Sequence, residues 1–272
     1  PPPLTLTSLA AAPAVIGPAA DGTGDTTTVS FTLGAAARVT AQILDASGTS
    51  LATLLDESRA AGPNTFTWAG HVVPDGRYRL AVTARAGTKS VTKAIDLVVD
   101  RTVTAVSASP PVLSPSGDGV NDTLTVSFGL AANVPVRLDI MKAGVVVATP
   151  FQGEPGIGPH TVVWDGTQGG VRLPDGQYVA ALTVTDALGD VVSALPLTID
   201  TVAPILTLLD LRTLRFSLSE PATVTLLLNG KTRIVRSEPK GTFAIGFPGA
   251  VAQLTAEAQD AGGNLSPVLE GG

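Results

Sequence analysis

The sequence of 272 residues has no cysteine, few aromatic residues and few charged ones. The absence of cysteine excludes disulfide bonds and thiolate metal sites, although it does not identify a cellular compartment. Aromatic residues make up 4% of the chain and charged residues 15%, against about 25% charged residues in an average soluble protein. Much of the surface must therefore consist of Thr, Ser, Ala and Gly.

Long apolar runs and basic clusters are also missing. No apolar run approaches the roughly 20 residues that a transmembrane helix needs, so we expect no membrane insertion. The formal net charge of -6, with no local cluster of Lys and Arg, argues against nucleic acid as a partner. The chain starts at Pro1 without Met or a signal peptide, which predicts a processed or excised piece.

Turn-forming residues and short alternating runs are abundant. The 29 Gly and 21 Pro are spread along the chain, which favours many short strands over long helices. Apolar residues alternate with polar ones in 28–33 and 78–83, the period expected of strands with one buried face. Turn signals such as Asn229-Gly230 separate such runs. The chain is therefore predicted to be all-β.

The sequence repeats itself. "TTTVSFTLGAAARVTAQI" with Phe31 aligns with "DTLTVSFGLAANVPVRLDI" with Phe128. A shorter third copy, "LRFSLSEPATVTLLL", aligns Phe216 with them and lacks the Trp and Pro-Asp-Gly segments. Such internal similarity is typical of tandem domains.

We therefore predict three tandem immunoglobulin-like antiparallel β-sandwich domains in a rod-like array. They span residues 1–100 (unit 1, with a Pro-rich lead), 101–200 (unit 2) and 201–272 (unit 3, shorter and a possible cap). Short joints at 100–103 and 200–204 leave little slack between them.

Paired positions in the repeats define a structural signature. Each Trp follows an alternating strand and precedes a Gly turn, so packing in or at the edge of the core is favoured over an exposed sugar-stacking platform. The Tyr after each Pro-Asp-Gly turn is interpreted in the same way, with its hydroxyl bonded to nearby backbone. The signature comprises Phe31, Trp68, Asp75, Gly76, Tyr78, Phe128, Trp164, Asp175, Gly176, Tyr178 and Phe216.

Unit 2 carries motifs that resemble a known domain family. "SPSGDGVND", a Phe-bearing strand, "WDGTQGG" and "LPDGQY" are similar to the immunoglobulin-like domain of flagellar hook-capping proteins, which also occurs as tandem or C-terminal modules of secreted bacterial proteins. Residues 110–200 show the closest resemblance and 13–100 a weaker one. Unit 3 is similar only to broad bacterial immunoglobulin-like repeats. The resemblance implies a structural or interaction element and names no ligand.

The loop "SPSGDGVND" has two interpretations. Asp118, Asn121 and Asp122 offer clustered oxygens for calcium, with Gly117 and Gly119 allowing a tight wrap. Asx turns that bond backbone N–H groups explain the same residues without a metal, and this interpretation is favoured. The copy in unit 1 has Gly24 in place of Asn121 and lacks that oxygen. No other cofactor is expected.

Catalytic motifs are not apparent. His71 and His160 do not align between the repeats and lie in no nucleophile or metal motif. The recurring Asp75 and Asp175 occupy turns, where local hydrogen bonding accounts for them. The chain is expected not to be an enzyme.

Two functional hypotheses remain. The first is a secreted or cell-surface scaffold, adhesive or fibre subunit that contacts other protein chains, including copies of itself. The alternative is a spacer or substrate-binding accessory region of a larger secreted hydrolase, although no aromatic strip supports polysaccharide binding. Leu4, Leu6 and Leu9 belong either to a strand added to a neighbouring subunit, or to the first strand of their own domain or a severed linker.

Overall fold

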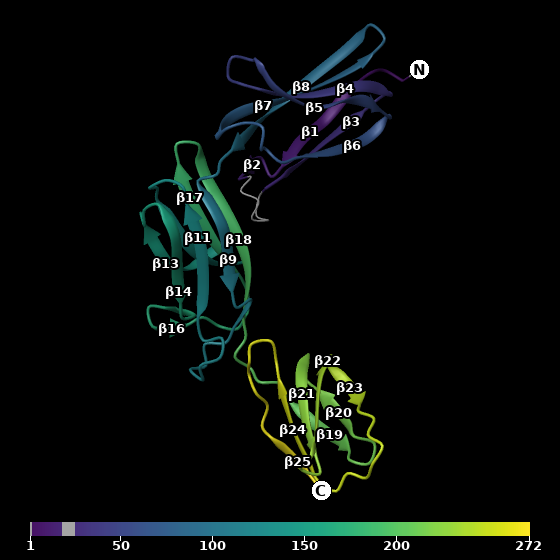
Figure 1. The fold of residues 1–272 in the computed structure, drawn as a ribbon, viewed down its shortest axis with the longest axis vertical. Helices are drawn as coiled ribbons and strands as arrows, with labels where there is room; N and C mark the ends of the chain where they lie inside the picture. Colours follow the sequence, from purple (N-terminus) through teal and green to yellow (C-terminus); the bar gives the residue numbers. More distant parts are fainter. Residues whose placement is uncertain (1, 18–24) are drawn as a thin grey trace.

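The computed structural model describes residues 2–17 and 25–272, and its secondary structure consists of strands. Three β-sandwiches follow one another along the chain, with the N-terminus at one end of the array and the C-terminus at the other (Figure 1). Each sandwich has its own hydrophobic core. None of the described residues forms a helix of the length and hydrophobicity that crossing a bilayer requires.

Unit 1 packs a three-stranded sheet, in the order β1-β3-β6, on a five-stranded sheet, in the order β2-β8-β7-β4-β5. All pairings are antiparallel except that of β2 with β8. The strands are β1 (Leu6–Ala12), β2 (Val15–Ile16), β3 (Thr27–Leu33), β4 (Ala37–Leu44), β5 (Ser50–Arg59), β6 (Gly62–Trp68), β7 (Gly76–Ala86) and β8 (Lys89–Val99).

Unit 2 repeats this plan, with sheets β9-β11-β14 and β10-β18-β17-β12-β13, and adds the small hairpin β15-β16. Even the bulge with positive φ at Ser8 in β1 recurs at Ala105 in β9. The strands are β9 (Val103–Ser109), β10 (Val112–Leu113), β11 (Leu124–Leu130), β12 (Val136–Lys142), β13 (Val145–Gly153), β14 (Gly158–Trp164), β15 (Thr167–Gln168), β16 (Val171–Arg172), β17 (Gly176–Asp186) and β18 (Gly189–Ile199).

Unit 3 keeps both sheets in reduced form, as β19-β20-β23 and β22-β21-β24-β25. Its strands are β19 (Leu206–Asp210), β20 (Arg215–Leu218), β21 (Ala222–Leu228), β22 (Thr232–Glu238), β23 (Gly241–Ala244), β24 (Leu254–Gln259) and β25 (Leu269–Gly271). Although it lacks the Trp and Pro-Asp-Gly segments, it still encloses a core around Phe216.

The central strands show why the period of two builds these sandwiches. Along β11, Leu124, Val126, Phe128 and Leu130 are buried, and the residues between them face outwards. The buried Phe lies opposite a different partner in each unit: Phe31 pairs with Asn64, Phe128 with His160 and Phe216 with Phe243. The period of two sets which face of each strand is buried. The residue opposite the Phe differs, and with it the packing of each core.

The N-terminal segment belongs to its own domain. Strand β1 pairs antiparallel with β3, Leu6 is buried, and Leu4 and Leu9 pack against the core of unit 1. The hypothesis that this segment adds a strand to a neighbouring subunit is therefore wrong. Its leucines are already used to close the first sandwich.

Candidate functional site: the joints between units

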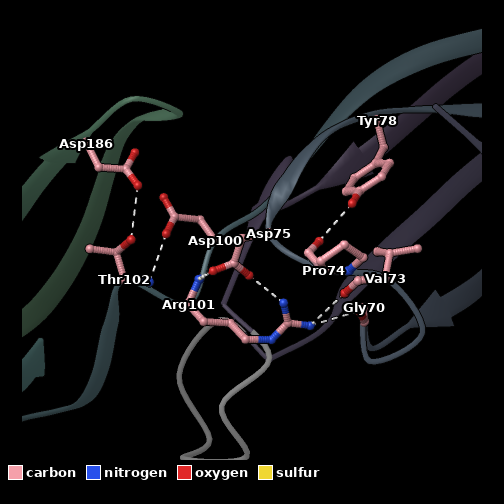
Figure 2. Close-up of polar contacts among 9 residues, drawn as sticks. All are labelled: Gly70, Val73, Pro74, Asp75, Tyr78, Asp100, Arg101, Thr102 and Asp186. Carbon is pink, nitrogen blue, oxygen red and sulfur yellow. Dashed lines mark hydrogen bonds and ion pairs between the residues drawn. The ribbon is translucent and has the colours of Figure 1, made fainter. Parts of the chain in front are cut away.

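The first joint is held by an ion pair between a turn of unit 1 and the linker. The Asp75 carboxylate accepts hydrogen bonds from the guanidinium and the backbone N–H of Arg101, which follows β8 (Figure 2). Arg101 also donates from Nη2 to the carbonyls of Gly70 and Val73, each at 3.1 Å. One side chain therefore fixes the start of the linker to the end of unit 1.

Unit 2 contacts the same linker through its β17–β18 hairpin. The backbone N–H of Thr102 donates to the buried Asp100 carboxylate at 2.8 Å, and its hydroxyl donates to Asp186 at 3.0 Å (Figure 2). Arg77 of unit 1 donates to the carbonyl of Leu188 in that hairpin. The linker and both units thus share one hydrogen-bonded network, which restricts their relative motion.

The second joint repeats the turn-to-linker bond with different chemistry. Asp175 occupies the position of Asp75, and its carboxylate accepts bonds from the backbone N–H and the hydroxyl of Thr201. Asp200 accepts the N–H of Val202 at 3.1 Å, as Asp100 accepts that of Thr102. The linker start is therefore fixed in the same way, without an arginine.

Buried amide contacts close this second joint. The Ser114 hydroxyl of unit 2 donates to Oδ1 of Asn264 in unit 3 at 2.6 Å, and both side chains are buried. Asn264 donates from Nδ2 to the carbonyl of Asp200 at 3.0 Å. Asn121 donates from Nδ2 to the carbonyl of Gly262 at 3.0 Å. Because these bonds are directional and the Ser114–Asn264 bond is buried, they set one orientation of unit 3 against unit 2.

Gly263 makes this close approach possible. Its φ is +93°, and a Cβ at this position would lie 2.3 Å from Cγ1 of Val120. A side chain here would be strained and would push against unit 2. The close contact between units 2 and 3 at the second joint therefore requires glycine at this position.

Three carboxylates meet at the second joint. Asp200, Glu220 and Asp260 have oxygens within 4.8 Å of one another, and all three residues are half-buried. Burial raises the pKa of Glu220, and the charges of Asp200 and Asp260 raise it further, whereas Lys240 opposes them. This joint therefore contains unfavourable like-charge interactions at neutral pH, in contrast to the Asp75–Arg101 pair of the first joint.

The "SPSGDGVND" loop is bonded to itself and to unit 3. Asp122 accepts the N–H groups of Gly117 and Gly119, both at 2.6 Å, and these donors lower its pKa. Asp118 accepts the N–H of Val120 at 2.8 Å. The bond to Asp118 forms the expected Asx turn, whereas the donors to Asp122 precede it in the sequence. Asn121 directs its amide nitrogen towards unit 3. A calcium ion at Asp118, Asn121 and Asp122 stays a prediction. The corresponding loop of unit 1, with Asp21 and Gly24, lies outside the described residues.

The paired aromatic residues lie inside the sandwiches. Trp68 and Trp164 are buried, and Trp164 donates its indole N–H to the carbonyl of Thr167 at 2.8 Å. The Tyr78 hydroxyl donates to the carbonyl of Pro74 at 2.8 Å, and Tyr178 donates to that of Pro174 at 2.5 Å. Burial, followed by the charge of Asp75, raises the pKa of Tyr78. Neither Trp presents an exposed face on which a sugar ring could stack.

Within residues 2–17 and 25–272, neither histidine forms an ion pair with a carboxylate. His160 donates from Nε2 to the carbonyl of Gly156 at 2.9 Å, and its ring is tilted against that of Phe128. It borders an open hollow of about 680 Å³ beside Gly129, and the described residues that line this hollow include no carboxylate. His71 is exposed in the turn after Trp68.

Sequence reasoning placed Asp75 and Asp175 correctly in turns but assigned them only local bonds. The structure shows that both reach the linker 26 residues further along the chain. A sequence signal for this role existed: each Pro-Asp-Gly turn recurs at a similar distance before a linker aspartate. Ser114, Asn264 and Arg77 were missed, because their partners come from another unit and leave no local pattern.

The sandwiches and their joints define an array of immunoglobulin-like domains. Residues 17–88, about a quarter of the chain, match the family model of the FlgD Ig-like domain. This match lies in unit 1, whereas the loop motifs are most complete in unit 2. No curated protein matches the sequence.

Several solved structures are similar to the chain at low sequence identity and low TM-score. A tetra-tandem repeat from the extending region of a large adhesion protein is 18% identical, with 99% of this chain and 74% of that chain covered and a TM-score of 0.28. Fibronectin(III)-like modules of Clostridium thermocellum CbhA are 14% identical, with 61% and 90% covered and a TM-score of 0.35. A segment of titin is 12% identical, with 90% of both chains covered and a TM-score of 0.33.

Proposed function

We propose that the chain is a non-enzymatic scaffold of a secreted or cell-surface protein, which holds its two ends apart and contacts other protein chains. The observation that carries this proposal is the bonding of both joints, where side chains tie each linker to the units on either side. A flexible tether would need no such bonds. An array with fixed joints keeps its two ends at a set distance and transmits force between them.

The composition supports the same function. The chain is poor in charge and carries many exposed Thr, Ser and Ala on its sheets. Such a surface suits contacts with neutral protein surfaces more than the binding of charged ligands.

Small-angle X-ray scattering of the purified chain tests the scaffold. We expect one elongated particle whose profile fits the arrangement in Figure 1. A profile that requires a broad ensemble of unit orientations would contradict the proposal. Antibody labelling of intact source cells tests the location, and labelling only after permeabilisation would exclude the cell surface.

The accessory-region alternative predicts a different result. Co-sedimentation with insoluble polysaccharides such as cellulose and chitin should retain a substrate-binding module. Because Trp68 and Trp164 are buried, we expect the chain to remain in the supernatant. Retention that survives 0.5 M salt would favour the alternative.

A further inference from the structure

Tension along the array acts on each unit through its N-terminal and C-terminal strands. The two ends of the chain lie at opposite ends of the array, so every unit in turn carries a pull on these ends (Figure 1). Backbone hydrogen bonds that must slide and break together resist such a pull more than bonds that break one after another. The three units differ in how their terminal strands are bonded.

In unit 1 the N-terminal segment bonds directly to the last strand. Strand β2 pairs parallel with the end of β8. The N–H of Val98 donates to the carbonyl of Ala14 at 2.9 Å, and that of Asp100 donates to the carbonyl of Ile16 at 2.8 Å. A pull on the start of one parallel strand and on the end of the other slides the two strands past each other. Both bonds are then loaded in shear at the same time.

Unit 2 repeats this pairing with β10 and β18. The N–H of Thr198 donates to the carbonyl of Pro111, and that of Asp200 donates to the carbonyl of Leu113, both at 3.0 Å. Leu113, like Ile16 of unit 1, is fully buried, which keeps water away from one side of the bonded backbone. We call the pairs β2–β8 and β10–β18 the terminal clamps.

Each terminal clamp ends where a joint begins. Asp100 and Asp200 donate their backbone N–H groups to the clamps, while their carboxylates accept the N–H groups of Thr102 and Val202 in the linkers. A pull that arrives through a linker therefore acts on the clamp of the preceding unit.

Unit 3 has no terminal clamp. Its first strand, β19, pairs antiparallel with β20 and stays in the smaller sheet. Its last strand, β25, has three residues, lies at the edge of the larger sheet and pairs antiparallel with β24. The structure describes all of residues 201–272, and none of their pairings joins β19 to β25. Either strand can therefore leave its sheet without sliding against the other.

We infer that unit 3 unfolds first when the array is stretched, and that the terminal clamps keep units 1 and 2 folded until it has done so. The core of unit 3 also contains the fewest buried residues, which favours the same order. This order rests on the proposed scaffold function, to which it adds an extensible element. Unit 3 would lengthen under load before the other sandwiches give way.

Single-molecule stretching of the full chain at constant force tests the order. Because the chain has no cysteine, one added at each end provides the attachment points. Unit 3 corresponds to roughly 260 Å of extended chain and each longer unit to roughly 360 Å, at about 3.6 Å per residue. We expect the short step first, with a lifetime about tenfold or more below those of the long steps, since forced unfolding follows the unfolding rate.

Proline variants test the clamps themselves. Val98→Pro removes the N–H that bonds to Ala14, on the side of β8 that faces away from β7. One of the two long steps should then come roughly fivefold sooner at the same force. Thr198→Pro should do the same for unit 2. Asp96→Pro is the matched control, because it lies on the same side of β8 outside the pair with β2, and β18 has Pro196 at the equivalent position.

Two results would overturn the inference: a long step that precedes the short one in most traces, or a Val98→Pro variant whose long steps keep the lifetimes of the Asp96→Pro control. Calorimetry without load checks that each variant is folded. Where Val98→Pro does not fold, Thr198→Pro and the order of steps in the wild type decide. Scattering is measured without tension, so an elongated particle would preserve the scaffold proposal even with a different order of unfolding.

Discussion

At the scale of single residues, the same side chain meets different partners at equivalent positions of the repeats. Asp75 binds an arginine and Asp175 binds a threonine, yet both fix the residue that begins a linker. The buried Phe of each unit likewise meets Asn64, His160 or Phe243. The repeats therefore conserve geometry more strictly than chemistry.

Trp164→Ala tests whether the buried ring supports unit 2. Its side chain is only 5% exposed, so its removal leaves a cavity. The free energy of unfolding of unit 2 should fall by about 3–5 kcal/mol, measured by chemical denaturation. Val163→Ala, on the exposed side of the same strand, should change it by about 0.5 kcal/mol or less. Equal effects of the two changes would contradict the burial of Trp164.

Asp118→Ala separates the two interpretations of the "SPSGDGVND" loop. Asp118 accepts a backbone N–H within the loop, so its loss should lower the melting temperature of unit 2 to the same extent in calcium and in chelator. Differential scanning calorimetry in both buffers measures this. A loss that appears only in calcium would establish a metal site, because a bound ion stabilises the folded state.

At the scale of strands and loops, much of the fold is predictable from sequence. Alternation alone identifies β3, β7 and β11, because one face of each is buried in its own core. The short hairpin β15-β16 and the switch from β1 to β2 are not predictable in this way. They consist of a few residues whose pairing depends on the sheets around them.

The joints were the least predictable part. Their key bonds join residues far apart in sequence, such as Ser114 with Asn264 and Thr102 with Asp186. Periodicity is a local signal and carries no information about such pairs. Local rules explained Asp118 and Asp122 well, since their partners lie within five residues, and failed for Asp75, whose partner does not.

Glu220→Gln tests the charge balance of the second joint. The pKa of Glu220 is raised in the folded protein, so the folded state binds the extra proton and its stability falls as pH rises through that pKa. The variant should therefore melt at a higher temperature than the wild type at pH 7. The difference should vanish below about pH 4, where the carboxyl is protonated in both states.

Glu270→Gln is the matched control for this change, since Glu270 is exposed on β25 of the same unit. Calorimetry of both variants between pH 3 and pH 8 measures the effect. A lower melting temperature for Glu220→Gln at pH 7 would show that the carboxylate has a favourable partner in the joint.

At the scale of the whole molecule, the function depends on fixed angles between units. The array in Figure 1 is extended because each linker is bonded at both ends. Most of its net negative charge lies in unit 2. The middle unit is thus the connector of the array.

Pulsed electron-paramagnetic-resonance distances across the second joint test this account most directly. Because the chain has no cysteine, one cysteine introduced on an exposed strand of unit 2 and one in unit 3 can be labelled without background. The account predicts a narrow distance distribution in the wild type and a broad one in Gly263→Ala, where the added Cβ meets Val120. Gly230→Ala should stay narrow, because this glycine also has positive φ but no neighbour within 4 Å. A broad distribution in the wild type would contradict the fixed joints and with them the scaffold.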